Sequence, residues 1–128
     1  MAAKDHRELR VYQLAFESAV QIFEITKKFP GDERYSLTDQ IRRSSRSVCA
    51  NVAEAWRKRR YPKHFVSKLS DADAEATETL VWLDFALHFG YLTADIHRDM
   101  TDRYDHVCSQ LSLMMAEPHK WIPKQSGA

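Results

Sequence analysis

The chain has 128 residues, of which 44% are hydrophobic and 29% charged, and its formal net charge is only +1. This length suits one domain with a core of its own, so we expect a single domain over residues 1–128. Three glycines and four prolines leave little material for glycine-rich phosphate loops, no apolar run approaches the roughly 20 residues of a membrane span, and the N-terminus lacks the apolar core of a secretory signal. We therefore expect a cytoplasmic protein with reduced thiols and no membrane association.

Turn-forming residues at positions 29–32, 61–62 and 90–93 divide the chain into four amphipathic segments. We predict the first helix over about residues 5–28, ended by Pro30, because a proline disfavours helical geometry in the residue before it. Its predicted inward stripe, at spacings of three and four, is Leu9, Tyr12, Phe16, Ala19, Phe23 and Thr26.

The second helix is predicted over residues 37–60, with Ser36 as its N-cap. Its inward stripe is Leu37, Ile41, Ser44, Val48, Val52 and Ala55. The opposite side is rich in arginine. Residues 36–63 hold eight basic side chains against two acids, a net of +6, whereas residues 64–105 hold three bases against nine acids, a net of −6. The near-neutral total therefore conceals a strongly dipolar chain.

The third helix is predicted over residues 62–89, ended by Gly90, and the fourth over residues 94–116, capped by Thr93. The stripe of the third is Phe65, Leu69, Ala72, Ala76, Leu80, Leu83 and Leu87. The stripe of the fourth is Ile96, Met100, Tyr104, Val107, Leu111 and Met114. Residues 117–128, with two prolines, are expected to be a loose tail. Four such helices with short connections predict an all-α, antiparallel up-down-up-down four-helix bundle.

Two helices carry more apolar surface than a monomeric bundle needs. The extra face of the first helix and that of the third are expected to contact another subunit, with the large aromatic residues as anchors. The predicted oligomer interface consists of Val11, Leu14, Ile22, Ile25, Trp82, Phe85 and Phe89. The alternative is a wide core stripe with a few exposed apolar side chains, which are normal on protein surfaces.

The arginine-rich side of the second helix is a candidate nucleic-acid site, because guanidinium groups match phosphate geometry. The candidate residues are Arg42, Arg43, Arg46, Arg57, Lys58, Arg59, Arg60 and Lys63. Tyr35 and Tyr61 flank them and could stack on unpaired bases. The alternative is a solvated face whose charges pair with the acidic helices, within or between subunits.

We find no residue set that predicts catalysis, a metal site or a cofactor. The four carboxylates Asp71, Asp73, Glu75 and Glu78 are scattered round the third helix, and solvent exposure or pairing with arginine is the expected role of those that share a face. The histidines show no zinc spacing, and Cys49 and Cys108 suit small core positions.

Several motifs together resemble a known family. They are L-x-V-x-Q at residues 9–13, TKKFP at 26–30, ERYSLTDQIRRS at 33–44, NVAE at 51–54 and GYL at 90–92. The chain resembles, over about residues 9–115, the four-helix-bundle proteins encoded in intervening sequences of bacterial 23S ribosomal RNA genes. The most specific part is the Y-x-L-x-x-Q-x-R-R block followed by N-x-A-E, which maps onto Gln40, Arg42, Arg43, Asn51 and Glu54.

The resemblance implies a four-helix bundle that assembles as a homopentamer. It also implies likeness to accessory proteins of diversity-generating retroelements, basic barrels thought to bind nucleic acid and a reverse transcriptase. Together with the charge pattern, it favours a non-enzymatic homo-oligomer whose basic surface binds RNA or a ribonucleoprotein. The alternative is a protein-binding adaptor without nucleic-acid affinity, and an enzyme of unknown type ranks third.

Overall fold

The computed structural model describes residues 3–123, and all regular structure within that range is helical. Four long helices follow one another along the chain: α1 (Arg10–Thr26), α2 (Leu37–Arg57), α3 (Pro62–His88) and α4 (Ala94–Ala116). Three short 3₁₀ helices accompany them: η1 (His6–Glu8), η2 (Gly31–Glu33) and η3 (Pro118–Trp121). The four predicted helices are therefore confirmed.

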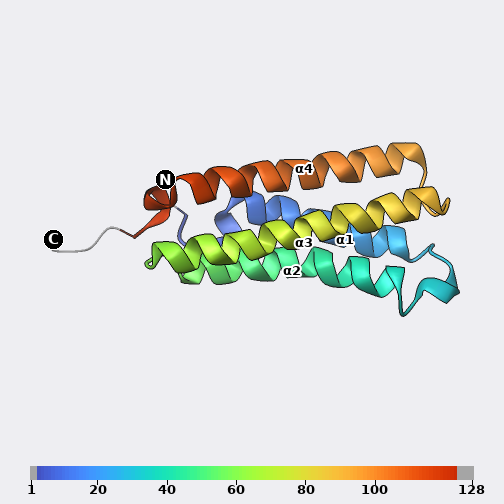
Figure 1. The fold of residues 1–128 in the computed structure, drawn as a ribbon, viewed down its shortest axis with the longest axis horizontal. Coiled ribbons are helices and arrows are strands. Elements are labelled where there is room, and N and C mark those ends of the chain that lie inside the picture. Colours follow the sequence, from blue (N-terminus) through green and yellow to red (C-terminus); the bar gives the residue numbers. More distant parts are fainter. Residues whose placement is uncertain (1–2, 124–128) are drawn as a thin grey trace.

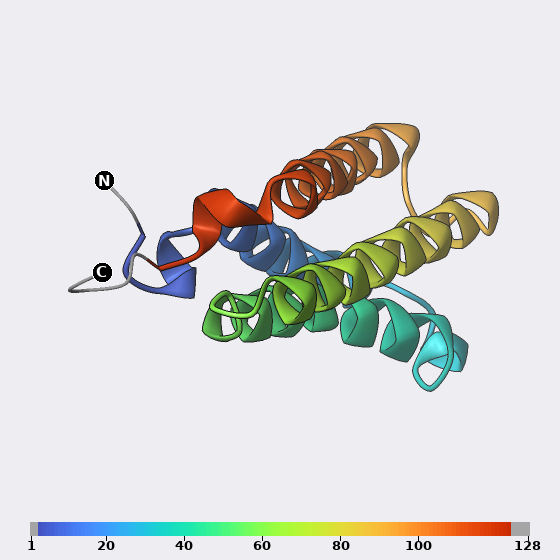
Figure 2. The ribbon, with the colours of Figure 1, turned by 60° about the vertical axis from the view of Figure 1, so that its left-hand side comes forward.

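The helices pack side by side in the order of the chain, and α1 and α4 close the arrangement. Figure 1 shows the α1–α2 and α3–α4 connections at one end and the α2–α3 turn at the other, beside both ends of the described chain. The turned view in Figure 2 again places the N-terminal segment, the C-terminal segment and this turn together. This arrangement brings residues from three distant parts of the sequence to one end of the bundle.

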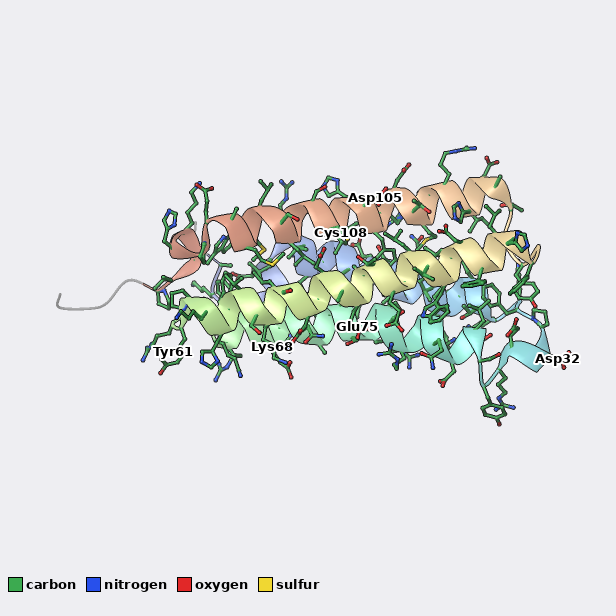
Figure 3. All side chains as sticks on the ribbon, viewed as in Figure 1. Asp32, Tyr61, Lys68, Glu75, Asp105 and Cys108 are labelled. Carbon is green, nitrogen blue, oxygen red and sulfur yellow. The ribbon has the colours of Figure 1, made fainter. Side chains whose placement is uncertain are left out.

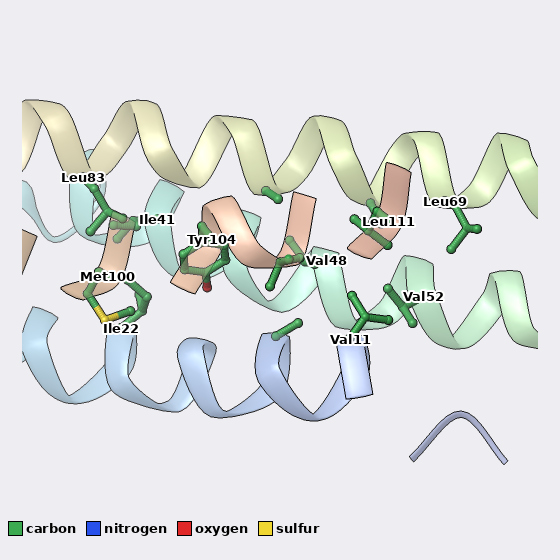
Figure 4. Packing of buried hydrophobic residues seen from close by; sticks show 14 of the residues in the cluster. Val11, Ile22, Ile41, Val48, Val52, Leu69, Leu83, Met100, Tyr104 and Leu111 are labelled. Carbon is green, nitrogen blue, oxygen red and sulfur yellow. The ribbon is translucent and has the colours of Figure 1, made fainter. Parts of the chain in front are cut away.

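The core takes its side chains from all four helices (Figure 4). Ile22 of α1, Val48 of α2, Leu83 of α3 and Tyr104 of α4 are each at most 1% exposed. The predicted stripe of α2 is buried along its whole length, and that of α4 is buried from Met100 onward. Two small polar residues also lie in the core, where the hydroxyls of Ser44 and Thr79 are 2.8 Å apart.

The register of α1 differs from the prediction. The buried residues are Val11, Ala15, Ser18, Ile22 and Thr26. Phe16 and Phe23, which we expected in the core, are 52% and 37% exposed. The small side chains of Ala15 and Ser18 let α1 approach its neighbours closely, so this face packs inward and the bulkier aromatic stripe remains outside.

The ends of the helices also differ in part from expectation. Ser36 does not cap α2 with its side chain. Its hydroxyl instead bonds Glu33, whose Oε1 accepts from the backbone N–H of Leu37 at 3.5 Å. Helix α3 ends as predicted at Gly90, which has a φ of 79°. The N–H groups of Gly90 and Tyr91 bond the Leu87 and Ala86 carbonyls, which is a Schellman motif.

Three further expectations need correction. Leu87 and Ile96, placed in the inward stripes, are 36% and 39% exposed; at that end of α3, Leu83 and Ala86 take the inner positions. The first helix begins at Arg10 rather than residue 5, after η1. The predicted loose tail instead begins with η3, whose Trp121 packs against the core; residues 124–128 of that tail lie outside the described range.

Candidate nucleic-acid interface

The eight predicted basic residues fall into two groups with different surroundings. Arg42, Arg43 and Arg46 lie within the first half of α2, between α1 and α3. The other five lie where α2 ends and α3 begins, in the turn at the end of the bundle marked by Tyr61 in Figure 3. We call these five the terminal basic cluster: Arg57, Lys58, Arg59, Arg60 and Lys63.

Arg43 is neutralised within the chain. Its guanidinium bonds Glu78 and lies 3.3 Å from Glu75 Oε2, both on α3. The Glu78 bond is the largest cause of the raised pKa of Arg43. Burial is the main reason that the pKa of Glu75 is raised, and its hydrogen bond with Glu78 adds to the effect. Pairing with arginine, one of the two roles expected for these carboxylates, is therefore confirmed for both.

The side chains of Arg42 and Arg46 contact residues of α1. Arg42 Nε donates to Thr26 Oγ1 at 2.8 Å, and its guanidinium carbon lies 4.6 Å from the ring centroid of Phe23. The guanidinium of Arg46 lies 6.0 Å from the same ring, at the outer limit of cation–π contact. These arginines therefore cover the part of the aromatic side of α1 around Phe23.

The terminal basic cluster has no carboxylate within 4.0 Å anywhere in residues 3–123. The nearest ion pair along these helices joins Lys68 Nζ to Glu54 Oε2 at 2.9 Å. The cluster spans the end of α2 at Arg57 and the start of α3 at Pro62. Five unpaired cations are thus concentrated at one end of the molecule.

Arg59 is the one half-buried member of that cluster. Its guanidinium carbon lies 3.9 Å from the ring centroid of Trp56, and Nη1 donates to the Trp56 carbonyl at 2.8 Å. Burial is the main cause of the lowered pKa of Arg59, and the positive charges of Arg57 and Arg60 lower it further. An anion at this position would relieve both effects.

The two predicted stacking tyrosines do not share a site. Tyr61 is 59% exposed and belongs to the turn that carries the terminal basic cluster. Tyr35 precedes α2 at its other end, about 30 Å away at 1.5 Å per helical residue. Only Tyr61 is therefore placed to act with the cluster.

The polar residues singled out by the family motifs have structural partners. Gln40 Oε1 accepts from Arg43 Nε at 3.4 Å, which extends the Arg43 network. Asn51 Nδ2 donates to the Ser47 carbonyl at 2.9 Å. Glu54 binds Lys68 and is the main cause of that lysine's raised pKa. Gln40 and Glu54 thus belong to networks that join α2 to α3.

The predicted subunit interface is only partly accessible. Val11 and Ile22 are 2% and 1% exposed in the core of the single chain, and Leu14 and Ile25 are half-buried against it. The interface assignment was wrong for Val11 and Ile22, because both belong to the core of the single chain. For Leu14 and Ile25 it stays a prediction. Trp82 is half-buried, whereas Phe85 and Phe89 are 46% and 51% exposed.

The accessible apolar face of α1 is formed by residues that the sequence analysis placed in the core or passed over. Phe16 and Val20 are about half exposed, at 52% and 49%, and Phe23 is 37% exposed. The small residues Ala15 and Ser18, which recur with Val11 and Ile22 at helical spacing, were the signal for the true inward face. For predicting which face of this helix is buried, small residues that allow close packing are a better signal than large aromatic residues.

Other candidate chemistry finds little support in the described residues. Burial raises the pKa of the Cys49 and Cys108 thiols to about 11, so both stay protonated at neutral pH. Between residues 3 and 123, no three His, Cys, Asp or Glu side chains gather as a metal ion would require. Over the same residues, no helix has the length and apolar character needed to cross a membrane.

Comparison with known proteins agrees with this architecture. A family model described as 23S rRNA-intervening sequence protein matches residues 7–113. The fold is also similar to a crystal structure from Bacteroides thetaiotaomicron VPI-5482, a protein of unknown function from the S23 ribosomal protein family. That similarity has a TM-score of 0.75 at 26% identity and covers 83% of this chain and 95% of the other. No curated protein has a significantly similar sequence. The chain therefore belongs to the 23S rRNA-intervening sequence protein family.

Proposed function

We propose that this member of the 23S rRNA-intervening sequence protein family is a non-enzymatic homo-oligomer whose basic surface binds RNA, alone or in a ribonucleoprotein. The observation that carries the proposal is the terminal basic cluster, five cations at one end of the bundle with no carboxylate partner in residues 3–123. The family's connection with ribosomal RNA supports an RNA ligand and a cytoplasmic location.

Arg43 and the terminal basic cluster differ in whether carboxylates already bind them, and this difference indicates which cations would bind RNA. Arg43 already has two carboxylate partners, so a phosphate would have to displace them. The terminal basic cluster has no such competitor in the part of the chain that the structure describes, and its cations would release counterions from the RNA when they bind phosphates. None of its members belongs to a base-reading motif, so contact with phosphates would give affinity with little sequence preference.

The test is a salt series of RNA-hairpin binding, measured by fluorescence anisotropy, with an acidic helical protein as the negative control. The proposal expects tight binding at low salt that weakens steeply as salt rises. The variant Arg57→Glu with Arg60→Glu should bind at least tenfold more weakly at equal helicity, since two phosphate contacts become repulsive. The matched control, Lys28→Glu with Arg34→Glu, makes the same charge change at the opposite end. An equal loss of RNA affinity in both double variants, or no RNA binding by the wild type, would refute the proposal.

Self-association is the second part of the proposal. Its support is two exposed apolar faces on different helices, one with Phe16 and Val20 on α1 and one with Phe85 on α3 and Phe89 just after it. The two faces are not the same surface, so contact between them would be head-to-tail, and such contacts close into rings when the rotation permits. The homopentamer implied by the family resemblance is one such ring.

A protein-binding adaptor without RNA affinity is the second candidate function. It is favoured by the intrachain ion pairs of Arg43 with Glu75 and Glu78, in which a residue of the basic surface serves helix packing. This alternative expects no RNA affinity at moderate salt and a native mass that changes with salt. The same salt series, combined with light scattering, distinguishes the two.

A further inference from the structure

A pocket of about 640 Å³ lies at the end of the bundle where the chain's N-terminal segment, η3 and the end of α2 meet. Its volume is within the range of roughly 300–1,000 Å³ that is usual for small-molecule sites. The residues that matter here are Arg10, Trp56, Arg59, Lys120 and Trp121. The pocket adjoins the terminal basic cluster, because Arg59 belongs to both.

The charge of the pocket favours an anion. Three cations line it, against the single carboxylate of Glu8. Lys120 is already paired with Glu117 at 2.8 Å. Arg59 is half-buried and has no carboxylate partner in residues 3–123; one of its N–H groups bonds the Trp56 carbonyl. A guanidinium that is partly removed from water without a counter-charge is an unfavourable arrangement that a bound anion would improve.

The walls of the pocket favour a planar apolar group beside that anion. Trp121 and Ile122 come from the C-terminal segment, and Leu9 from the N-terminal segment. The ring of Trp56 supports the guanidinium of Arg59 at 3.9 Å. Indole rings and guanidinium planes are the surfaces on which unpaired bases stack in proteins that bind single-stranded RNA.

We propose that this pocket binds a nucleoside monophosphate group, with the phosphate at Arg59 and the base against Trp121. The group could be the 5′-terminal nucleotide of a single-stranded RNA or a free mononucleotide. This inference rests on the proposed function, because phosphates on Arg57 and Arg60 would lead an RNA strand to Arg59. The inference goes beyond that function because it assigns a site for the terminal nucleotide of an RNA strand, whereas the proposed function concerns only phosphates along the RNA backbone.

The experiment uses the full chain and four probes: adenosine 5′-monophosphate, a single-stranded oligoadenylate with a 5′-phosphate, the same oligonucleotide without it, and an RNA hairpin. Binding of the first three is read from tryptophan fluorescence in a Trp82→Phe background, which leaves Trp56 and Trp121 as reporters. Among residues 3–123 the indole N–H of Trp82 finds no hydrogen-bond partner, so this replacement breaks no bond there. Hairpin binding is read from anisotropy.

The expected result is that the 5′-phosphate improves oligonucleotide binding about tenfold, as a charge-assisted hydrogen bond would. Arg59→Gln should abolish that advantage, and Arg59→Lys, which keeps the charge but not the paired donors, should restore only part of it. Trp121→Leu should weaken all single-stranded probes, whereas Lys28→Gln at the opposite end should change nothing. Trp121→Phe keeps an aromatic wall and should weaken these probes less than Trp121→Leu.

The outcomes separate the two proposals. If the mononucleotide competes with the oligonucleotide, the pocket accepts the free group; if only the phosphorylated oligonucleotide binds, it accepts an RNA end. Equal binding of both oligonucleotides, unchanged by Arg59→Gln, would overturn the pocket assignment even if the hairpin still binds in a salt-dependent way. Failure of every RNA probe and the mononucleotide would overturn both proposals.

Discussion

Arg43 on α2 and Glu75 on α3 are joined across the boundary between the two helices, with Nη1 and Oε2 3.3 Å apart. This ion pair divides the basic side of α2 into a part that serves packing and a part that remains available. Seen from the sequence alone, the arginines form one continuous run. In the folded chain, Arg43 is neutralised by α3 and Arg42 is bonded to Thr26, whereas the cations near the α2–α3 turn have no carboxylate partner in residues 3–123.

Loss of the Arg43 network should reduce stability without affecting RNA binding. In Arg43→Gln, Glu75 and Glu78 would remain close together without a cation between them. The groups are partly exposed, so we expect a loss of about 0.5–1 kcal/mol at low salt, less at high salt. Urea unfolding at two salt concentrations measures this. A loss that is independent of salt, or a loss of RNA affinity, would contradict this division of the arginines.

Removal of cluster cations should reduce the salt dependence of RNA binding in steps. Arg57→Gln and Arg60→Gln should each remove one phosphate interaction, which lowers the slope of log affinity against log salt by roughly 0.7–0.9. Arg42→Gln serves as the control, because Arg42 is engaged with Thr26 and Phe23. If Arg42→Gln changed the slope of log affinity against log salt by the same amount, the arginines would act through the overall charge of the protein and not through individual phosphate contacts.

The register of α1 can be tested by two truncations. Ile22→Ala should cost about 2–5 kcal/mol, since Ile22 is 1% exposed in the core. Phe16→Ala should cost less than about 1 kcal/mol at low protein concentration, because Phe16 is 52% exposed. Chemical denaturation of both variants measures the difference. The opposite order of costs would show that the aromatic stripe is the buried one.

Glu33 should make stability depend on acid pH. Its carboxylate accepts from Ser36 and from Tyr91, at 2.9 Å for the tyrosine, and these two bonds are the main causes of its lowered pKa. A lowered folded-state pKa stabilises the protein above the ordinary value of 4.5, and that contribution is lost as pH falls through the folded-state pKa.

Glu33→Gln should therefore be less stable than wild type at neutral pH, and the difference should shrink below about pH 4.5. Unfolding by urea across an acid pH series measures it. Glu17→Gln is the control, because Glu17 is exposed and has no ion pair within residues 3–123. A difference between Glu33→Gln and wild type that does not vary with pH would refute the assignment to this carboxylate.

Self-association should depend on the exposed aromatic residues. Phe85→Glu should lower the native mass in light scattering, because a charge would enter the apolar interface. Phe16→Glu should have the same effect if the α1 and α3 faces meet. Leu113→Glu is the control, since Leu113 is 70% exposed on α4. A monomeric wild type would refute the assembly itself.

Much of the fold was predictable because helical periodicity is local. The inward stripe of α2, from Leu37 to Ala55, is buried as expected, and Gly90 ends α3 with a positive φ. The prediction for α1 failed for a specific reason. Both faces of that helix are apolar, so spacing alone could not decide between Ile22 and Phe23. The small residues Ala15 and Ser18 let one face pack closely, and Arg42 covers part of the other.

For the candidate site too, some features were predictable from the sequence and others were not. The sequence by itself determined that eight cations are concentrated around α2 and that α3 is acidic, because composition and helical spacing depend only on neighbouring positions. Only the tertiary structure decided that Arg43 meets Glu75 and that the N-terminal segment and η3 form a pocket beside Arg59. Those relationships join residues from different helices, or from the two ends of the chain, and depend on how the helices pack.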